Sequence, residues 1–188
     1  MPTPLPDFPR TTPPPLADLT AAELSLRAAR QADLPFLYAL YAGFRAAELA
    51  LAPWTAAQKE VFLVDQFRLQ HVHFTRFHPR AGFWVVERPH AHPVGRLYLD
   101  RSARFWRIVD IGLAPEARGQ GLGSVLLTWV QHAAEAARAK GVDLHVAPTN
   151  PRAGALYARL GFRETQPDVT THRRMEWRPG GTERFERD

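Results

Sequence analysis

The stretch from residue 105 to residue 141 constrains the fold most, because a strand pattern, a glycine-rich turn and a long helix pattern follow one another directly. Phe105–Leu113 alternates as a strand does, and Arg118–Gly123 reads Arg-Gly-Gln-Gly-Leu-Gly. The following helix carries an apolar stripe at Leu122, Val125, Leu126, Trp129, Val130 and Ala133. This unit favours an α/β fold in which a strand runs through a tight turn into a helix.

The glycine loop has the chemistry of a phosphate site. Glycines let the backbone approach a ligand closely, and the free N–H groups at a helix start attract an anion with help from the helix dipole. A Walker loop would need a lysine after its last glycine, and none stands here. A Rossmann fingerprint would lie near the start of a βαβ unit, whereas this loop lies past mid-chain. The loop alone therefore leaves open a phosphate site or a plain turn.

The remaining elements complete a mixed α/β pattern. Thr55 and Gln58 have the spacing of a capping box and predict a helix running to about Phe77, while Asp33 and Asn150 are predicted N-caps of two further helices. Further strands are predicted near Leu24–Arg27, Phe83–Glu87, Val94–Asp100, Val142–Ala147, Phe162–Thr165 and His172–Trp177. The sum is a mixed sheet with helices on both faces.

A length of 188 residues suits a single domain with a real core. Residues 1–23 are rich in proline and are expected to be extended or disordered. Residues 24–178 form the predicted folded domain, and residues 179–188 a polar, flexible tail. The chain has no cysteine, which excludes a disulfide scaffold, thiolate zinc sites and a cysteine acyl-enzyme.

Composition also bears on which classes of partner to expect: membrane, nucleic acid and metal ions. No apolar run reaches the length of a membrane span, and the N-terminus lacks the pattern of a secretory signal, so we expect a cytoplasmic protein with no membrane partner. The net charge of +5 comes almost wholly from scattered arginines, so no nucleic acid is expected. His71 and His78 share a helix face but do not make a zinc geometry, and no metal is expected.

A second motif follows the glycine loop: Asn150–Tyr157 leads into Leu160-Gly161-Phe162. Together the two segments resemble the GNAT superfamily of acetyl-coenzyme A-dependent N-acetyltransferases. The superfamily's Gln/Arg-x-x-Gly-x-Gly/Ala signature is matched by Arg118, Gly121 and Gly123. Its later pattern is matched by Asn150, Ala153, Leu156, Tyr157, Gly161 and Phe162. The resemblance covers roughly residues 24–177.

The resemblance implies a mostly antiparallel central sheet that is splayed between its fourth and fifth strands, with a bulge in the strand before the glycine loop. It implies acetyl-coenzyme A as co-substrate, no metal, and direct transfer of the acetyl group to a small-molecule amine or a peptide. A homodimer is compatible with it. The alternative is a catalytically silent module of the same fold that binds acyl-coenzyme A as a sensor.

Cofactor-binding positions carry over residue by residue. Backbone amides of the loop would hold the pyrophosphate, at Arg118, Gly119, Gln120, Gly121, Leu122, Gly123 and Ser124. Leu113 is the position whose backbone N–H would polarise the thioester carbonyl. Asn150 would contact the cofactor arm, although its role as a plain N-cap is equally compatible.

Tyr157 matches the tyrosine that protonates the leaving thiolate in this superfamily. A phenol with a pKa near 10 can act as a general acid at neutral pH. The competing interpretation is packing, because Tyr157 shares a helix face with Ala153 and Leu160.

Asp110 is the candidate base, since many relatives carry a carboxylate on this strand. The alternation places it on the same face as Ile108 and opposite Val109. A purely structural pairing with Arg107 or another arginine is the competing interpretation. The other candidates for the base are His145 and Glu87.

Overall fold

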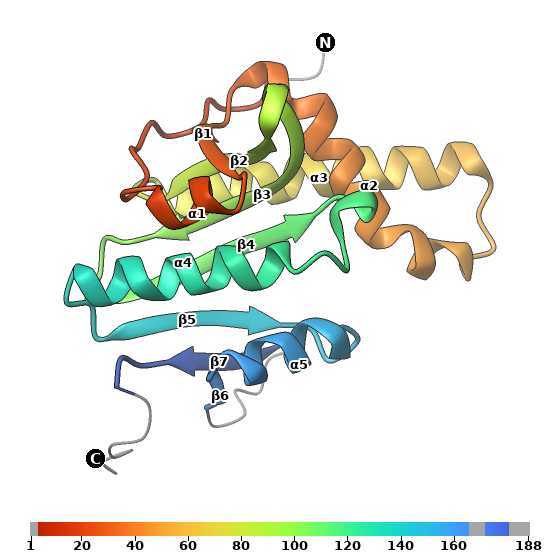
Figure 1. Ribbon diagram of the computed structural model, residues 1–188. Coiled ribbons are helices and arrows are strands. Elements are labelled where there is room, and N and C mark those ends of the chain that lie inside the picture. Colours follow the sequence, from red (N-terminus) through yellow and green to blue (C-terminus); the bar gives the residue numbers. More distant parts are fainter. Residues whose placement is uncertain (1–3, 166–171, 181–188) are drawn as a thin grey trace.

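The chain forms one seven-stranded sheet in the computed structural model, which describes residues 4–165 and 172–180 (Figure 1). The strands lie in the order β1-β2-β3-β4-β5-β7-β6, and all neighbours are antiparallel except the parallel pair β4 and β5. Their bounds are β1 Ser25–Ala28, β2 Gly82–Arg88, β3 His92–Asp100, β4 Phe105–Leu113, β5 Gly141–Val146, β6 Arg163–Glu164 and β7 Arg173–Trp177. The expected mostly antiparallel sheet is confirmed.

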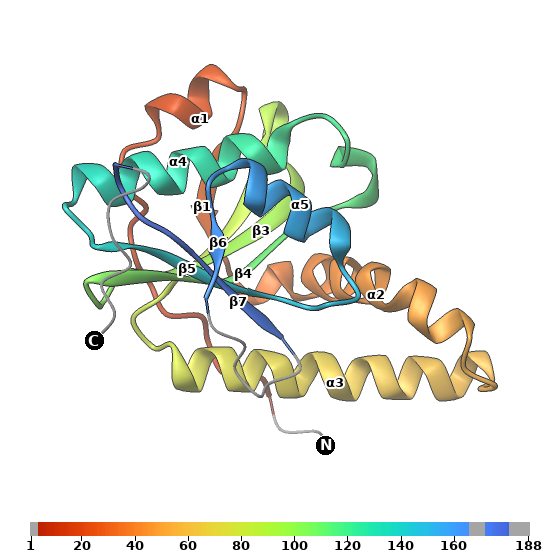
Figure 2. The same ribbon diagram turned by 90° about the horizontal axis from the view of Figure 1, so that it is seen from below.

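Helices cover both faces of the sheet (Figure 2), as predicted. They are α1 Ala17–Ala21, α2 Leu34–Ala50, α3 Ala56–Phe77, α4 Leu122–Ala136 and α5 Pro151–Arg159, with short 3-10 turns at Gln31–Asp33, Pro89–Ala91 and Pro115–Ala117. Helices α1, α4 and α5 lie on one face, and α2 and α3 on the other. No helix among residues 4–165 and 172–180 is both long and apolar enough to cross a bilayer.

Strand alternation divides the core between these two faces. Trp84 and Leu97 belong to a buried cluster that also contains the apolar face of α4. Their strand neighbours Phe83 and Tyr98 belong to a second cluster with residues of α2 and α3. Successive side chains on a strand point to opposite faces, so β2 and β3 contribute to both clusters.

A bulge in β4 corrects the predicted facing of its residues. Tyr98 of β3 pairs with Asp110, but the next residue, Leu99, pairs with Ile108, so Val109 is an extra residue in β4. Ile108 consequently lies in the α4-side cluster, while Val109 packs against the cluster under α2 and α3. The prediction that Ile108 and Asp110 share a face was wrong because simple alternation does not survive a bulge. The bulge itself was expected from the resemblance.

The parallel strands β4 and β5 pair over only part of their length. Their register runs from Phe105 opposite Gly141 to Ile108 opposite Leu144. Beyond that point, β4 continues to Leu113 without a partner in β5 among the described residues, and the two strands diverge (Figure 1). The expected splay between the fourth and fifth strands is thus present, and it opens toward the glycine loop.

The proline-rich segment packs onto the body over its described part, residues 4–23. Residues 4–16 run mostly as an extended chain, and Leu19 in the short helix α1 is fully buried. The buried indoles of Trp84 and Trp129 donate hydrogen bonds to backbone carbonyls of this segment, at 3.2 and 2.8 Å. Proline lacks an N–H but keeps its carbonyl, so a proline-rich chain can still accept from buried donors. Residues 181–188 of the predicted tail lie outside the described residues.

His71 is one of the side chains that this segment covers. Its Nε2 lies 2.7 Å from the carbonyl oxygen of Pro6, and its ring meets that of Phe8 edge-on at 4.7 Å. Burial lowers the pKa of His71, so it acts as a neutral core residue. Among the described residues there is no group of three or more potential ligands that could hold a metal ion.

Candidate active site

The glycine loop adopts a conformation that its glycines make possible. Gly119 and Gly121 have φ angles of 74° and 79°, in the left-handed region where a side chain is strained. A Cβ atom at either position would meet no atom within 4 Å, so packing does not require glycine there. The outer side of the loop is open, and α4 begins immediately after Gly121.

The loop presents a row of backbone N–H groups without backbone acceptors. Ser124 N–H is not one of them, because it already donates to Gly121 O at 2.9 Å, and Val125 N–H donates to the same oxygen at 3.1 Å. The N–H groups of residues 119–123 have no backbone acceptor in the described part of the chain. Such orphan donors at a helix start suit an anion. The sequence interpretation included the amides of Arg118 and Ser124, but the row runs only from Gly119 to Gly123, because the N–H of Arg118 also has an acceptor, Pro115 O at 3.2 Å.

Two arginines stand beside this row. Arg118 donates through Nε to Leu113 O at 2.9 Å, and its guanidinium lies 5.2 Å from the ring centre of Phe44. Arg88 of β2 donates to the side-chain oxygen of Gln120 at 2.5 Å. The side chain of Gln120 is therefore held in place, while its backbone N–H remains part of the row. The positive charges add to the attraction for an anion.

Helix α2 approaches β4 closely at Gly112. A Cβ atom there would come within 2.3 Å of the Phe44 ring, so only glycine lets this ring lie on the strand. Next to it, Leu113 pairs with Gly95 of β3 at the end of β4. Leu113 thus lies where β4 has separated from β5 and directly before the turn to the glycine loop. Sequence analysis did not identify the Phe44 contact, because it joins distant segments.

Asn150 caps α5 as predicted, since its Oδ1 accepts a hydrogen bond from Ala153 N–H at 3.2 Å. Its side-chain NH₂ group has no partner among the described residues. Leu122 contributes a buried side chain to the core, so any ligand contact from it comes from its backbone.

Tyr157 of α5 combines a packed ring with an unpaired hydroxyl. The residue is 8 % exposed, and its ring centre lies 5.9 Å from that of Phe162. The hydroxyl has no hydrogen-bond partner among the described residues, yet it is not one of the buried orphan atoms, so it touches solvent. Burial raises the pKa of Tyr157 to about 12, and the negative charge of Asp110 also raises it. The two candidate catalytic groups are therefore electrostatically coupled.

Asp110 forms an ion pair, but its partner is Arg96 of β3 and not Arg107. The Arg96 side chain is 2 % exposed, whereas that of Asp110 is 21 % exposed. Arg96 also donates to Gln70 of α3 at 3.2 Å and lies 5.4 Å from the ring centre of Tyr98. The Asp110 carboxylate is thus held by a buried arginine and remains partly accessible to solvent. A charged residue inside the apolar strand pattern of β3 was the signal that could have identified Arg96.

The two other candidates for the base differ in position. Glu87 lies on β2, two strands away from β4, and is bound to Arg27 at 2.6 Å. It is therefore not at the site. His145 lies on β5, beside the splay, and is largely exposed; partial desolvation of its ring and the charge of Arg107 lower its pKa.

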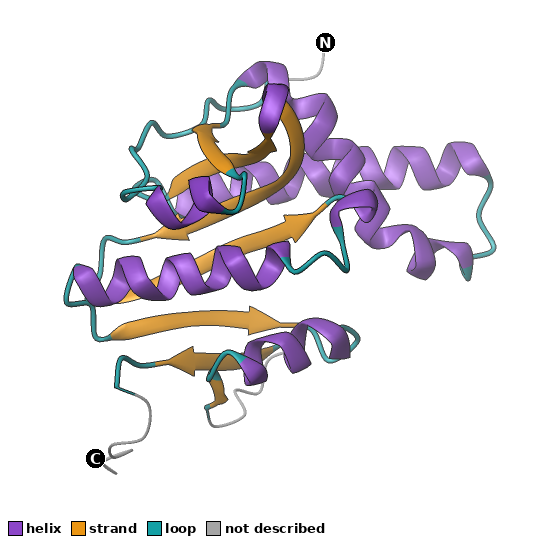
Figure 3. Ribbon diagram, viewed as in Figure 1, coloured by secondary structure: helices purple, strands orange, loops and turns teal. Residues whose placement is uncertain are grey.

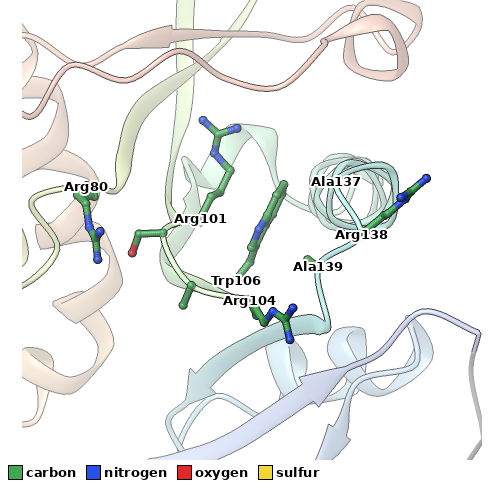
Figure 4. Close-up of a pocket in the computed structure, with 9 residues that line it drawn as sticks. Arg80, Arg101, Arg104, Trp106, Ala137, Arg138 and Ala139 are labelled. Carbon is green, nitrogen blue, oxygen red and sulfur yellow. The ribbon is translucent and has the colours of Figure 1, made fainter.

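A cavity of about 720 Å³ lies at the other end of β4 (Figure 4). Its lining includes Arg101, Arg104 and Trp106, with Ala137–Ala139 on the far side. These residues flank the first residues of β4, whereas the glycine loop follows the last one. The cavity therefore shares no residue with the predicted site.

Comparison with known sequences agrees with this geometry. The Acetyltransferase (GNAT) family matches residues 40–162. The chain is 34 % identical over 110 residues to a mycothiol acetyltransferase of Parafrankia sp. (strain EAN1pec), which covers 54 % of this chain and 30 % of that protein. It is 33 % identical over 104 residues to a mycothiol acetyltransferase of Pseudarthrobacter chlorophenolicus, covering 54 % and 26 %. The chain thus spans less than a third of the length of these relatives.

Solved structures show the same fold. The PaiA N-acetyltransferase from Thermoplasma acidophilum, in complex with coenzyme A, aligns with a TM-score of 0.63 at 15 % identity over 82 % of this chain and 98 % of that one. The Vibrio cholerae spermidine N-acetyltransferase, in complex with coenzyme A and spermine, aligns with a TM-score of 0.55 at 22 % identity over 82 % and 94 %. Because the family match covers more than half of the residues and the fold agrees, the chain belongs to the acetyltransferase (GNAT) family.

Proposed function

We propose that this chain transfers an acetyl group from acetyl-coenzyme A directly to the amine of a small molecule or a peptide. The observation that carries the proposal is the open row of backbone N–H groups at residues 119–123, next to the place where β4 leaves β5. The charge of Asp110 on β4 acts on the phenol of Tyr157 on α5, which supports pairing the two as base and acid. Family membership supports the reaction class.

The residues present fit acetyl-coenzyme A. The N–H groups of residues 119–123 would hold its pyrophosphate, aided by the positive charges of Arg118 and Arg88. The backbone of Leu113 would face the thioester in the gap beside β5, and the side-chain NH₂ of Asn150 is free to contact the cofactor arm. Ser124 can offer only its hydroxyl, because its N–H is already bonded.

The reaction requires one bond to form and one to break. One proton must leave the amine, and one must reach the departing sulfur. The amine nitrogen bonds to the acetyl carbonyl carbon while the carbon–sulfur bond of the thioester breaks. Asp110 takes the amine's proton, through a water molecule, and Tyr157 gives a proton to the departing sulfur. A Lys-like amine has a pKa near 10.4 and must lose a proton before it attacks. With a pKa of about 12, Tyr157 remains protonated at neutral pH. The chain has no cysteine, so no cysteine thioester forms on the way.

The main alternative is a sensor that binds acyl-coenzyme A without turnover. It needs the same loop but no accessible acid. The Tyr157 hydroxyl has no partner in the described part of the chain and touches solvent, which favours the enzyme. A cytoplasmic location, a homodimer and the choice between a small amine and a peptide remain predictions.

Calorimetric titration with acetyl-coenzyme A and with ATP tests the binding half of the proposal. We expect heat with acetyl-coenzyme A and much weaker binding of ATP. At 100 times the Kd, a ligand that binds only the folded state stabilises it by about 2.7 kcal/mol, which raises the Tm by roughly 5–10 °C for a chain of this size. No heat and no change of Tm with saturating acetyl-coenzyme A would overturn the proposal. Tighter binding of ATP would point to a different nucleotide-binding protein.

A further inference from the structure

An ion cluster lies on the side of the sheet that faces away from α4, next to the point where β4 and β5 stop pairing. Asp143 of β5 is its centre, with a side chain only 3 % exposed. Arg107 of β4 donates to it through Nε and a terminal nitrogen at 2.9 and 2.7 Å. Arg174 of β7 approaches it at 3.0 and 2.7 Å in the same way. We call these three residues, with Glu176, the Asp143 cluster.

The Asp143 cluster faces away from α4. The neighbours of Asp143 on β5, Val142 and Leu144, both lie in the α4-side core, so alternation turns Asp143 to the opposite face. This is also the side on which Asp110 meets Arg96, which lies between the rings of Phe44 and Tyr98. The cluster and the candidate base therefore share one face of the sheet.

The solvent-facing side of the cluster is positive. The two carboxylates are buried, with side chains 3 % and 8 % exposed, whereas Arg107 and Arg174 are 41 % and 34 % exposed. Burial of Asp143 acts to raise its pKa, but the hydrogen bonds and charges of Arg107 and Arg174 outweigh this and lower it, and the same hydrogen bonds hold both guanidiniums. The second terminal nitrogen of each arginine has no partner among the described residues. Each guanidinium is thus held in place by Asp143 and still has an unused N–H donor, which suits an incoming carboxylate.

The position of the cluster relates it to the reaction. Arg107 lies three residues before Asp110 on β4, which corresponds to about 10 Å along a strand and less with the bulge between them. An amine that is deprotonated by Asp110 would therefore place a group at its other end near Arg107 and Arg174. A negative group there would be attracted, and a second ammonium group would be repelled.

We infer that the acceptor is an amine that also carries a carboxylate, separated from the amine by a chain of roughly 5–10 Å, and that Arg107 and Arg174 bind this carboxylate. The inference rests on the proposed acetyl transfer and names its substrate class. The competing interpretation is that the Asp143 cluster only stabilises the sheet at a partly exposed position, since two arginines on a buried carboxylate need no ligand to be satisfied.

Three amines with the same carbon chain separate these interpretations. The probes are 6-aminohexanoate, hexylamine and 1,6-diaminohexane, whose far ends are negative, apolar and positive. For the wild-type protein we expect kcat/KM to be highest for 6-aminohexanoate, about tenfold or more above hexylamine, and lowest for the diamine. Equal values, or a preference for the diamine, would overturn the inference while leaving acetyl transfer intact. Failure to acetylate all three would count against the proposed function itself.

Variants then assign the preference to the cluster. In Arg174→Gln, the ratio of kcat/KM for 6-aminohexanoate over hexylamine should fall toward one, because the variant lacks a guanidinium that binds the carboxylate. The ratio is insensitive to the fraction of folded protein, since both values come from the same protein sample. Arg174→Lys keeps a charge beside Asp143 and should retain part of the ratio, which also guards against a Gln variant that fails to fold. Arg159→Gln removes a charge from an exposed residue of α5, which lies on the opposite face of the sheet, and should leave the ratio unchanged. A ratio that survives Arg174→Gln would show that the preference arises elsewhere.

Discussion

Replacing Tyr157 by phenylalanine should lower kcat by about 10²–10⁴-fold, the usual contribution of a positioned general acid. The change removes only the hydroxyl, so the ring should keep its contact with Phe162 and the protein should remain folded. Affinity for acetyl-coenzyme A should change little, because the proton is needed mainly in the transition state. Steady-state kinetics and a calorimetric titration on the same variant check both halves. A folded variant with full turnover would leave Tyr157 as a packing residue.

The pH profile adds a second readout for the same pair of residues. Tyr157 must keep its proton to donate it, and its pKa is raised to about 12 by burial and by the charge of Asp110. Wild-type kcat should therefore persist through pH 10, where an ordinary tyrosine is half ionised. In Asp110→Asn, the negative charge is absent, so the pKa of Tyr157 should fall and the loss of activity should begin at a lower pH. The same variant should lose most activity at low pH, where the amine is hardest to deprotonate. A wild-type profile in Asp110→Asn would assign the base to His145 or to water.

Replacing Gly121 by aspartate should weaken acetyl-coenzyme A binding by about 10–100-fold or more, because a negative charge would stand beside the N–H groups that hold the pyrophosphate. The site has room for a side chain, since a Cβ atom would meet nothing within 4 Å. Its φ of 79° adds strain of about 1 kcal/mol, which aspartate and asparagine tolerate better than most residues.

Gly121→Asn is the matched control, because it has the same shape and backbone strain without the charge. We expect the aspartate variant to bind more weakly than the asparagine variant, with the difference shrinking at high salt. Equal affinities of the two variants would mean that the phosphates lie elsewhere. Gly123 is less suitable for this test, since a Cβ atom there would come within 3.3 Å of Leu156 and disturb the packing of α4 against α5.

Local signals in the sequence were sufficient for much of the fold. Thr55 and Gln58 form the predicted capping box, with bonds of 3.2 and 2.9 Å, and helix α3 ends at Phe77 as expected. The N-cap position of Asp33 was also correct, but its carboxylate binds Arg27 at 2.7 Å and leaves the amides of α2 alone. Caps, glycine turns and helical stripes depend on residues that are close in sequence, and for this reason a single sequence is sufficient to predict them.

Features that depend on distant segments could not be predicted in the same way. The bulge at Val109 follows from how β4 pairs with β3, and no pattern within β4 marks it. The partner of Asp110 is Arg96 of the neighbouring strand, whereas the sequence left Arg107 and every other arginine open. The proline-rich segment packs against the body partly because the buried indoles of Trp84 and Trp129 need acceptors, and these residues lie far along the chain.

The candidate site shows the same division. The conformation of Gly119 and Gly121 and the cap at Asn150 were predictable from the motif. The exclusion of Ser124 from the row of free amides was not, because it depends on a hydrogen bond formed within the folded turn.

The central claim is tested most directly by product analysis. The protein should be incubated with acetyl-coenzyme A and 6-aminohexanoate, while the release of free thiol is followed and the amine is examined by mass spectrometry. We expect thiol and N-acetylated product to appear in equal amounts, at a rate that depends on the amine concentration and that falls in Gly121→Asp at the same acetyl-coenzyme A concentration. Thiol release without an acetylated amine would show hydrolysis in place of transfer. Tight binding of acetyl-coenzyme A with no product from any amine, even over long incubation, would contradict the enzyme and leave the sensor.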